Sequence, residues 1–258
     1  MNLQELQQHW NEFGKQDPMW AILTEPTKAG GNWDPSEFFA RGEVEINHIF
    51  ALLEAKGLTI ETKRALDFGC GVGRLTQALC KRFDEAHGID IAPSMIEAAN
   101  RFNQYGSRCH YHLNSQDNLR LFSDHYFNFI YSVIVLQHMR PEYSLNYVKE
   151  FMRVLAPQGL AVFQMPSHLT VDTAPGEYSV AAGQEPIIQR SWWQRLLNKP
   201  HQLTATQESL QPKMEMYGVR RDMVEKTLKK AGGKVIETIQ DTWSGPNWVS
   251  FTYIVTRA

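Results

Sequence analysis

Short apolar runs alternate with segments of helical periodicity through the middle of this chain, and the alternation limits the folds open to it. The run at 63–68 leads into a glycine-rich turn and then into apolar residues at helical spacing over 74–83. Strands that alternate with helices predict a doubly wound α/β fold with a mostly parallel sheet. The other strand-like runs are 85–91, 109–113, 127–136 and 159–166, and the other helical segments are 92–106 and 144–156.

The turn after the first run is almost free of side chains. Gly69, Gly71 and Gly73 follow a GxGxG spacing, whereas a dinucleotide-binding turn is written GxGxxG. In a doubly wound sheet, ligands bind at the carboxyl ends of the strands, where this turn lies. Asp67, just before the turn, would repel a pyrophosphate and suits a ligand that carries an ammonium group. Asp90, at the end of the second strand, is placed to accept both hydroxyls of a ribose.

Composition narrows the class of protein. The 258 residues are enough for one large α/β domain with a cap, and the net charge of −2 without a Lys/Arg block argues against a nucleic-acid partner. Cys70, Cys80 and Cys109 form no CxxC pair, which fits a reducing compartment. The polar start and the lack of an apolar run near the roughly 20 residues of a membrane span predict a cytoplasmic protein without stable membrane insertion. A basic segment with two tryptophans at 186–200 is the candidate for weak surface contact.

Four stretches of the chain resemble one family. "ALDFGCGVGRLTQAL" and "GIDIAPSMIEAA" are similar to the first two motifs of the class I S-adenosylmethionine-dependent methyltransferases. "FNFIYSVIVLQHM" and "FMRVLAPQGLAVFQMP" are similar to the motifs around the fourth and fifth strands. The resemblance implies a Rossmann-like, seven-stranded sheet with an antiparallel last strand, and S-adenosyl-L-methionine as the cofactor. The C-terminal part of the chain agrees with this resemblance, because it has a helical segment at 220–233 and strand-like runs at 234–243 and 248–258.

The resemblance also assigns cofactor-binding residues. Asp67, Gly69 and Gly71 would lie at the methionine end, and Asp90 would hold the ribose. After the third strand the family usually has a "GDA"-like step that holds the adenine amino group, and here "NSQD" stands in its place. The remaining positions that the resemblance assigns to the cofactor are Gly73, Ile91, Met95, Ser115, Gln116 and Val133.

The regions around this core are expected to select the acceptor. We divide the chain into an N-terminal helical cap (1–63), a cofactor-binding core (64–166), a substrate-lid insertion (167–216) and the end of the core (217–258). All seven tryptophans lie outside residues 65–165. They either pack the cap onto the core or line an apolar acceptor pocket. By family analogy, the cap also brings Phe39, Arg41 and Gly42 toward the cofactor.

His138 is the first candidate for a base, because it follows the strand whose end faces the methyl group in this fold. An imidazole there can take a proton from an acceptor hydroxyl near neutral pH. The alternative is that His138 caps or packs locally. Tyr178, Glu177 and His168 are weaker candidates in the insertion.

Metal binding is not expected. Metal-dependent catechol-type members of the family carry acids after the fourth strand, where this sequence has "VLQHM". His110 and His112 alternate in a strand and so share a face, which is typical of an outer strand as well as of a metal pair.

These observations predict methyl transfer from S-adenosylmethionine to a small-molecule acceptor. A hydroxyl acceptor is favoured and an amine remains open. Two other functions stay open as well, a non-catalytic S-adenosylmethionine-binding protein and an NAD-dependent oxidoreductase.

Overall fold

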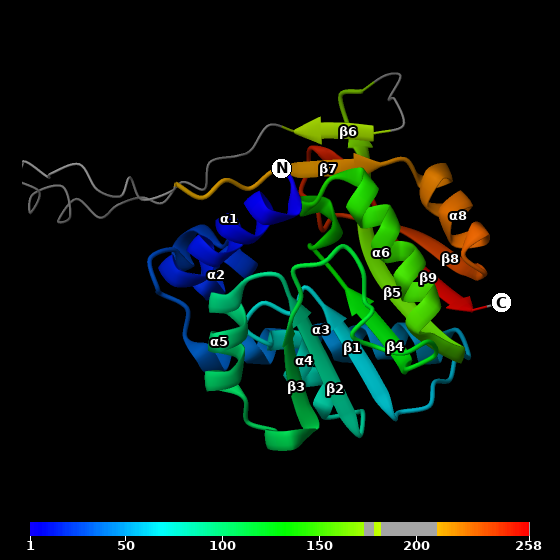
Figure 1. Cartoon of the computed structure of the whole chain (residues 1–258), viewed down its shortest axis with the longest axis horizontal. Coiled ribbons are helices and arrows are strands. Elements are labelled where there is room, and N and C mark those ends of the chain that lie inside the picture. The colour runs from blue at the N-terminus through cyan, green and yellow to red at the C-terminus, as the bar shows by residue number, and fades with distance from the viewer. Residues whose placement is uncertain (173–177, 182–210, 258) are drawn as a thin grey trace, which may run out of the picture.

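The computed structural model describes residues 1–172, 178–181 and 211–257, and their centre is a seven-stranded sheet in the order β3-β2-β1-β4-β5-β9-β8 (Figure 1). β9 runs antiparallel to both of its neighbours, while β1 to β5 pair in parallel. The predicted doubly wound fold with an antiparallel last strand is therefore confirmed. The strands are β1 (Arg64–Phe68), β2 (Glu85–Asp90), β3 (Cys109–Leu113), β4 (Phe127–Ser132), β5 (Leu155–Leu169), β8 (Gly233–Asp241) and β9 (Trp248–Arg257).

Helices cover both faces of this sheet because successive strand residues point to opposite sides. Ala65 of β1 packs in the cluster under α3 (Pro35–Ala55) and α4 (Arg74–Cys80). Leu66 and Phe68 pack on the other face, in the cluster with α6 (Pro141–Val154) and α8 (Arg221–Lys230). β4 is buried along its whole length, as expected for a strand with helices on both sides.

The N-terminal segment folds as helices that dock beside the sheet. α1 (Leu3–Gln16) begins at a capping box between Asn2 and Glu5, and α2 (Pro18–Ile22) follows it directly. α1 lies against α5 (Pro93–Phe102), where the Ser94 amide and hydroxyl donate to Asn11. This contact sets the start of α1 and α2 over the carboxyl end of the sheet (Figure 1).

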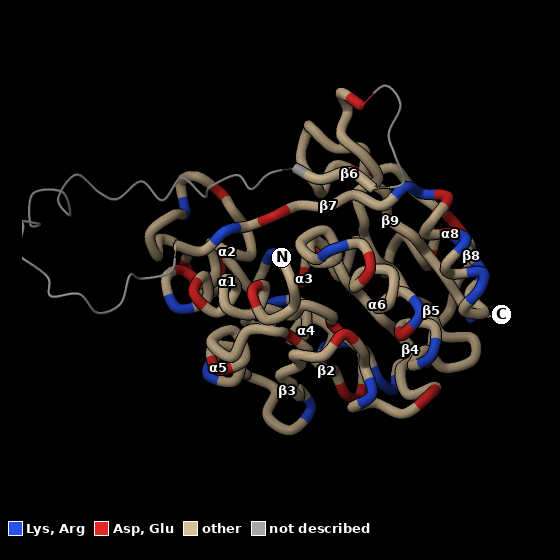
Figure 2. Tube along the Cα trace, turned by 45° about the horizontal axis from the view of Figure 1, so that its top comes forward, with Lys and Arg blue, Asp and Glu red and all other residues tan. Residues whose placement is uncertain are grey.

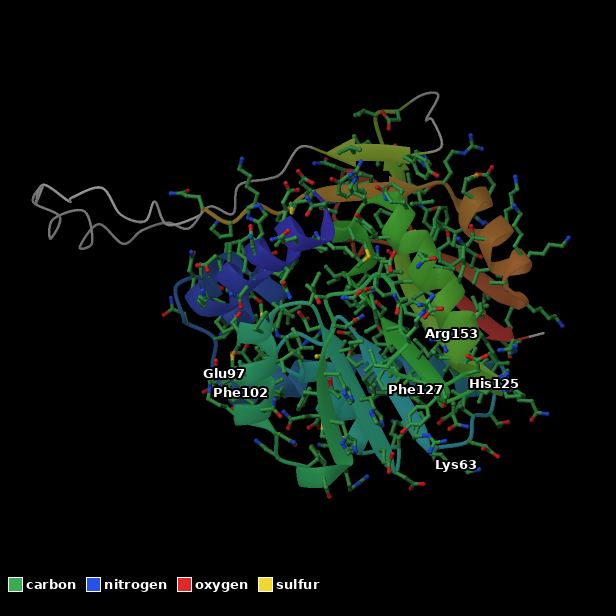
Figure 3. The ribbon with its side chains drawn as sticks, viewed as in Figure 1. Lys63, Glu97, Phe102, His125, Phe127 and Arg153 are labelled. Carbon is green, nitrogen blue, oxygen red and sulfur yellow. The ribbon has the colours of Figure 1, made fainter. Side chains whose placement is uncertain are left out.

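The connection between β3 and β4 is a loop without a helix, and α6 supplies its anchor. Arg153 of α6 donates to the carbonyls of Leu119 and Phe122 and forms an ion pair with Asp124 at 2.7 Å. In return, the amide of His125 donates to the Arg153 carbonyl at 3.0 Å, and the two residues lie close together in Figure 3.

Three elements differ from the sequence-based expectation. The strand expected at 127–136 ends at Ser132, because Ile134 has a φ of 59° and the 3-10 turn η3 (Leu136–His138) follows. β5 extends beyond the expected 159–166 at both ends. β6 (Tyr178–Ala181) of the 167–216 insertion pairs with β7 (Met216–Val219), which crosses the expected end of that insertion, in a separate two-stranded sheet. Among the described helices, none has both the length and the apolar character of a membrane span.

Candidate functional site

A cavity of about 2130 Å³ opens at the carboxyl ends of β1, β2 and β4, beneath α1 and α2. It lies where a doubly wound sheet usually binds its ligand. Residues far apart in the sequence form its walls, since the cap, the turn after β1 and the loop after β4 all contribute. The predicted site residues that line it are Gly69, Gly71, Asp90, Ile91, Met95, Val133 and His138.

The glycine turn is closely covered by other parts of the chain. Gly71 has a φ of +52°, and a Cβ built there would lie 2.4 Å from the Ile22 side chain of α2. Gly73, the residue before α4, has a φ of +85°, and its Cβ would lie 2.3 Å from the Tyr111 hydroxyl. Both positions therefore need glycine for two reasons, the left-handed backbone and the close approach. Gly73 does not line the cavity.

Asp90 joins the end of β2 to the glycine turn. One carboxylate oxygen accepts the Gly71 amide at 2.9 Å, and the other accepts the Ala92 amide at 2.8 Å. A carboxylate has about four lone-pair positions, so each oxygen can accept a further hydrogen bond. Burial raises the pKa of Asp90, and the backbone hydrogen bonds oppose that rise.

Asp67 is buried outside the cavity lining. Its carboxylate accepts the Thr76 hydroxyl at 2.6 Å, and burial raises its pKa to about 7. A contact between Asp67 and a ligand's ammonium group is thus not part of the observed geometry, and the assignment stays a prediction.

Asn114 lines the cavity after β3, where the family resemblance had led us to expect Ser115 and Gln116. Both of those side chains are exposed and outside the lining, whereas Asn114 is buried and lines the cavity. The Asn114 amide nitrogen donates to the Asn118 carbonyl at 2.9 Å, and its oxygen accepts the Gln116 amide at 3.2 Å. Asn114 is the first residue of the same "NSQD" segment, one position before Ser115.

Arg74, the first residue of α4, is a lining residue that the sequence analysis did not single out. Its guanidinium forms a buried ion pair with Glu45 of α3 at 2.8 Å, and Glu45 also accepts the Tyr131 hydroxyl at 3.0 Å. Its Nε is buried without a hydrogen-bond partner. A buried cation with a spare N–H therefore borders the cavity beside the glycine turn.

His138 lies in η3, with both ring nitrogens in contact with the protein. Nδ1 is 3.0 Å from the Glu215 carbonyl, to which only an N–H can bond, so Nε2 is left to accept the Gln137 amide at 3.2 Å. The ring packs edge-on against Trp10 at 5.2 Å, and burial lowers its pKa to about 4. These contacts favour local packing, and the role as a base stays a prediction.

Aromatic residues and methionines form another part of the cavity wall. Trp10 and Trp20 come from the N-terminal helices and Trp243 from the turn between β8 and β9. Trp33 and Trp248 are buried and do not line the cavity. The other members of this wall are Phe13, Met214 and Met216. Trp192 and Trp193 lie outside the described residues.

The remaining expected residues lie away from this wall or outside the described parts. Arg41 lines the cavity and stacks over the Trp33 ring, while Gly42 packs against the backbone of Arg74. His168 bonds to Ser167 and borders a separate, smaller pocket near α8. Tyr178 is 44% exposed on β6. Glu177 and segment 186–200 fall outside the described residues.

Comparison with known proteins agrees with this geometry. A family model described as a methyltransferase domain matches residues 65–159. Tocopherol O-methyltransferase of Arabidopsis thaliana is 29% identical over 165 residues, 61% of this chain and 44% of that protein. Trans-aconitate 2-methyltransferase of Methylobacterium radiotolerans is 28% identical over 169 residues, 62% of each chain. The chain thus spans less than two thirds of the length of these curated relatives.

Solved structures share the fold over nearly the whole chain. Magnesium protoporphyrin IX methyltransferase of Synechocystis, solved with bound S-adenosylhomocysteine, superposes with a TM-score of 0.59 at 14% identity. The match covers 98% of each chain. At that identity the likeness concerns the architecture.

Proposed function

We propose that this chain, whose residues 65–159 match a methyltransferase domain, transfers a methyl group from S-adenosylmethionine to a small-molecule acceptor. A hydroxyl is the favoured acceptor atom. The relatives that support this choice include a tocopherol O-methyltransferase.

The residues of the cavity fit S-adenosylmethionine. Asp90 keeps lone pairs free for two ribose hydroxyls at the end of β2. Ile91 and Met95 supply apolar contacts beside it, and Asn114 supplies a polar side chain after β3. The buried Nε–H of Arg74 is a donor without a partner, which suits the carboxylate of the methionine moiety.

The proposal that an acceptor binds in the cavity beside the cofactor rests on the size of the cavity. Sites for one small ligand usually measure about 300–1,000 Å³. The cavity here, at about 2130 Å³, exceeds the upper end of that range and so has room for the cofactor and a second molecule. Its lining includes polar groups such as Asp90 and the aromatic side chains of Trp10, Trp20 and Trp243. An acceptor with a large apolar surface suits these aromatic side chains.

The chain's own residues would act mainly by alignment. The bound cofactor supplies a methyl group on a positively charged sulfur, which is already activated for transfer. The cap and the aromatic wall would hold the acceptor in line with that group, and such positioning is a large part of catalysis between two bound reactants. His138 as a base would have to release its Nε2 from Gln137, whereas water could take the proton without a rearrangement.

We also propose the domain division given by the sequence. Residues 1–63 supply the roof of the cavity, and 167–216 contribute Met214 and Met216 to its wall. The three cysteines are buried free thiols, which supports a reducing, cytoplasmic location. Acidic and basic residues are interspersed along the described trace in Figure 2, which supports a small-molecule acceptor over a nucleic acid.

Calorimetric titration with S-adenosylhomocysteine and, separately, with NAD tests the cofactor. We expect binding of the first and none of the second; the reverse result would favour the oxidoreductase. A screen of metabolite pools with methyl-labelled S-adenosylmethionine then tests transfer. Label in an extracted small molecule supports the proposal, and binding without transfer to any acceptor class would favour the non-catalytic alternative.

A further inference from the structure

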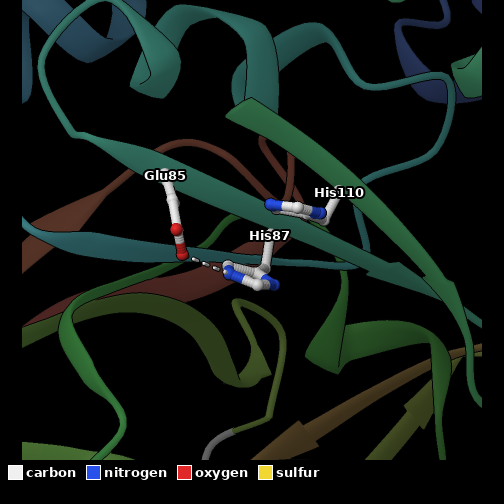
Figure 4. Close-up of side chains that lie close together, drawn as sticks. All are labelled: Glu85, His87 and His110. Carbon is white, nitrogen blue, oxygen red and sulfur yellow. Dashed lines mark ion pairs between the residues drawn. The ribbon is translucent and has the colours of Figure 1, made fainter. Parts of the chain in front are cut away.

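Three histidines and a glutamate gather on one face of β2 and β3. The parallel pairing sets His87 beside His110 and Ile89 beside His112. Because side chains alternate along a strand, Glu85 and His87 of β2 share their face with the two β3 histidines. Figure 4 shows the side chains of Glu85, His87 and His110 close together.

His87 has an unused nitrogen within this cluster. The residue is only 5% exposed, and its Nε2 has no hydrogen-bond partner. Its Nδ1 lies 3.0 Å from Nε2 of His112. When Nδ1 donates its proton to His112, Nε2 keeps a free lone pair that is directed among its neighbours. A buried nitrogen in that state is costly unless something binds it.

The neighbours of this nitrogen are metal-ligand atoms at suitable separations. A Glu85 carboxylate oxygen lies 3.6 Å from His87 Nε2. That is long for a hydrogen bond, but zinc bonds of ~2.0–2.1 Å at tetrahedral angles place two ligands about 3.3 Å apart. The ligand atoms of Glu85, His87 and His110 all lie within 4.8 Å of one another. The His87 and His110 rings are stacked at 21° with their centroids 4.7 Å apart, so the half-buried His110 ring would have to turn to aim its nitrogen at the same ion.

We propose that Glu85, His87 and His110 bind one Zn²⁺, with His112 fixing the tautomer of His87 and water as the fourth ligand. A metal-binding histidine usually donates its other N–H to such a partner. Two nitrogens and one carboxylate oxygen are a ligand set that zinc uses in proteins.

The surroundings prepare His87 for this role. The rings of Phe122, Tyr126 and Phe127 pack edge-on against its imidazole at 5.4–5.6 Å and fix its orientation.

The ion would lie away from the cofactor end of β2. At ~3.3 Å per residue, His87 is about 10 Å and Glu85 about 16 Å from Asp90 along the strand. β3 is the edge strand and pairs only with β2 in the sheet. An ion held by both strands would fasten that edge. The sequence led us to expect no metal, because the segment after the fourth strand lacks the acids of the metal-dependent members. The pairing of β2 with β3 adds His87 to the His110–His112 pair.

Titration of tag-free, chelator-treated protein with Zn²⁺ tests the site. Glu85→Gln and His110→Asn remove ligands at half-buried positions, so both variants should fold. His48→Asn removes an exposed histidine of α3 and serves as the matched control. We expect one Zn²⁺ per chain in the wild type and the control, with affinity more than about 10-fold weaker in the ligand variants, since even loss of a ligand's hydrogen-bond partner costs about 10- to 100-fold.

Two further measurements complete the test. Zn²⁺ should raise the melting temperature of the wild type and the control but not of Glu85→Gln or His110→Asn. S-adenosylhomocysteine affinity should be the same in all of them, which separates this site from the proposed function. No zinc binding by the wild type, or equal affinity in the ligand variants, would overturn the proposal.

Discussion

The backbone amide of Ile134 donates a 3.0 Å hydrogen bond to the side-chain oxygen of Gln164. Ile134 is β-branched and has a φ of 59°, a conformation that costs about 1–3 kcal/mol and persists only when its surroundings hold it. The amide nitrogen of Gln164 donates in turn to the hydroxyls of Ser244 and Ser250, each at 2.7 Å. The strained loop after β4, which lines the cavity, is thus tied to β5 and to the β8–β9 hairpin.

Replacement of this glutamine should be costly. Gln164→Leu leaves the Ile134 amide without its acceptor, and an unsatisfied group of this kind costs about 1–3 kcal/mol. The Ser244 hydroxyl keeps Gln137 and Ser250 as partners, so we expect urea unfolding to show a loss within that range. Gln240→Leu, at an exposed position of β8, is the control and should stay within about 0.5 kcal/mol of the wild type. Equal stability of the two variants would mean that Gln164 does not hold the loop.

Removal of the Asp90 carboxylate should weaken cofactor binding. The charge-assisted hydrogen bonds to a ribose are worth roughly 1.5–3 kcal/mol, so Asp90→Ala should bind S-adenosylhomocysteine about 10- to 150-fold less tightly. Asp84→Ala, at an exposed position before β2, should bind normally. Unchanged affinity in a folded Asp90→Ala protein, measured by calorimetry, would remove Asp90 from the ribose.

A side chain at Gly71 should displace the cap as well as strain the turn. In Gly71→Val the new Cβ meets Ile22 at 2.4 Å, whereas Gly57 has a φ of +68° with open space around it. Gly57→Val therefore carries a comparable backbone strain without the collision. We expect S-adenosylhomocysteine binding to disappear only in Gly71→Val. If both folded variants bind the ligand, the turn does not approach it.

The pH dependence of stability should reveal the buried His138. Its pKa falls from 6.5 in the unfolded chain to about 4 in the folded one, because burial disfavours the imidazolium. Between these values the unfolded chain binds more protons, so stability is complete above about pH 6.5 and is lost toward pH 4, by up to roughly 3 kcal/mol.

His138→Gln isolates this contribution. His87, with its pKa also lowered, acts in the same direction, and Asp67, with its pKa raised, acts in the opposite one. Both groups are present in the wild type and the variant, so the difference between their unfolding curves from pH 7 to pH 4.5 belongs to His138. Parallel curves would show that the imidazole titrates normally.

Turnover separates the two roles considered for His138. If it is the base, His138→Ala should slow methyl transfer by about 10²- to 10⁴-fold with cofactor affinity intact. The wild-type rate should then fall only as the pH approaches 4, since that is where this imidazole gains its proton. Near-normal turnover of the variant at saturating acceptor would leave His138 with a packing role.

The sequence by itself determined the architecture, because the signals for it are local. Strand-like runs, helical periodicity and the glycine turn depend on neighbouring residues, and they predicted the parallel sheet, while the family resemblance implied the antiparallel last strand. The boundary errors have local causes as well, such as the left-handed Ile134 that ends β4 early. Asp90 and the glycines could be singled out because Asp90 ends a strand and the glycine turn follows one.

Tertiary structure alone decided which side chains share a space. Asn114 rather than Ser115 or Gln116 lines the cavity, because the loop after β3 turns the latter two toward solvent. Arg74 forms an ion pair with Glu45 of α3, which lies 29 positions earlier in the sequence. The alternation of His110 and His112 was visible in the sequence, but their meeting with His87 depends on the register between β2 and β3. Register is set by packing of the whole sheet. A one-residue shift of β3 against β2 would send the His110 and His112 side chains to the opposite face of the sheet.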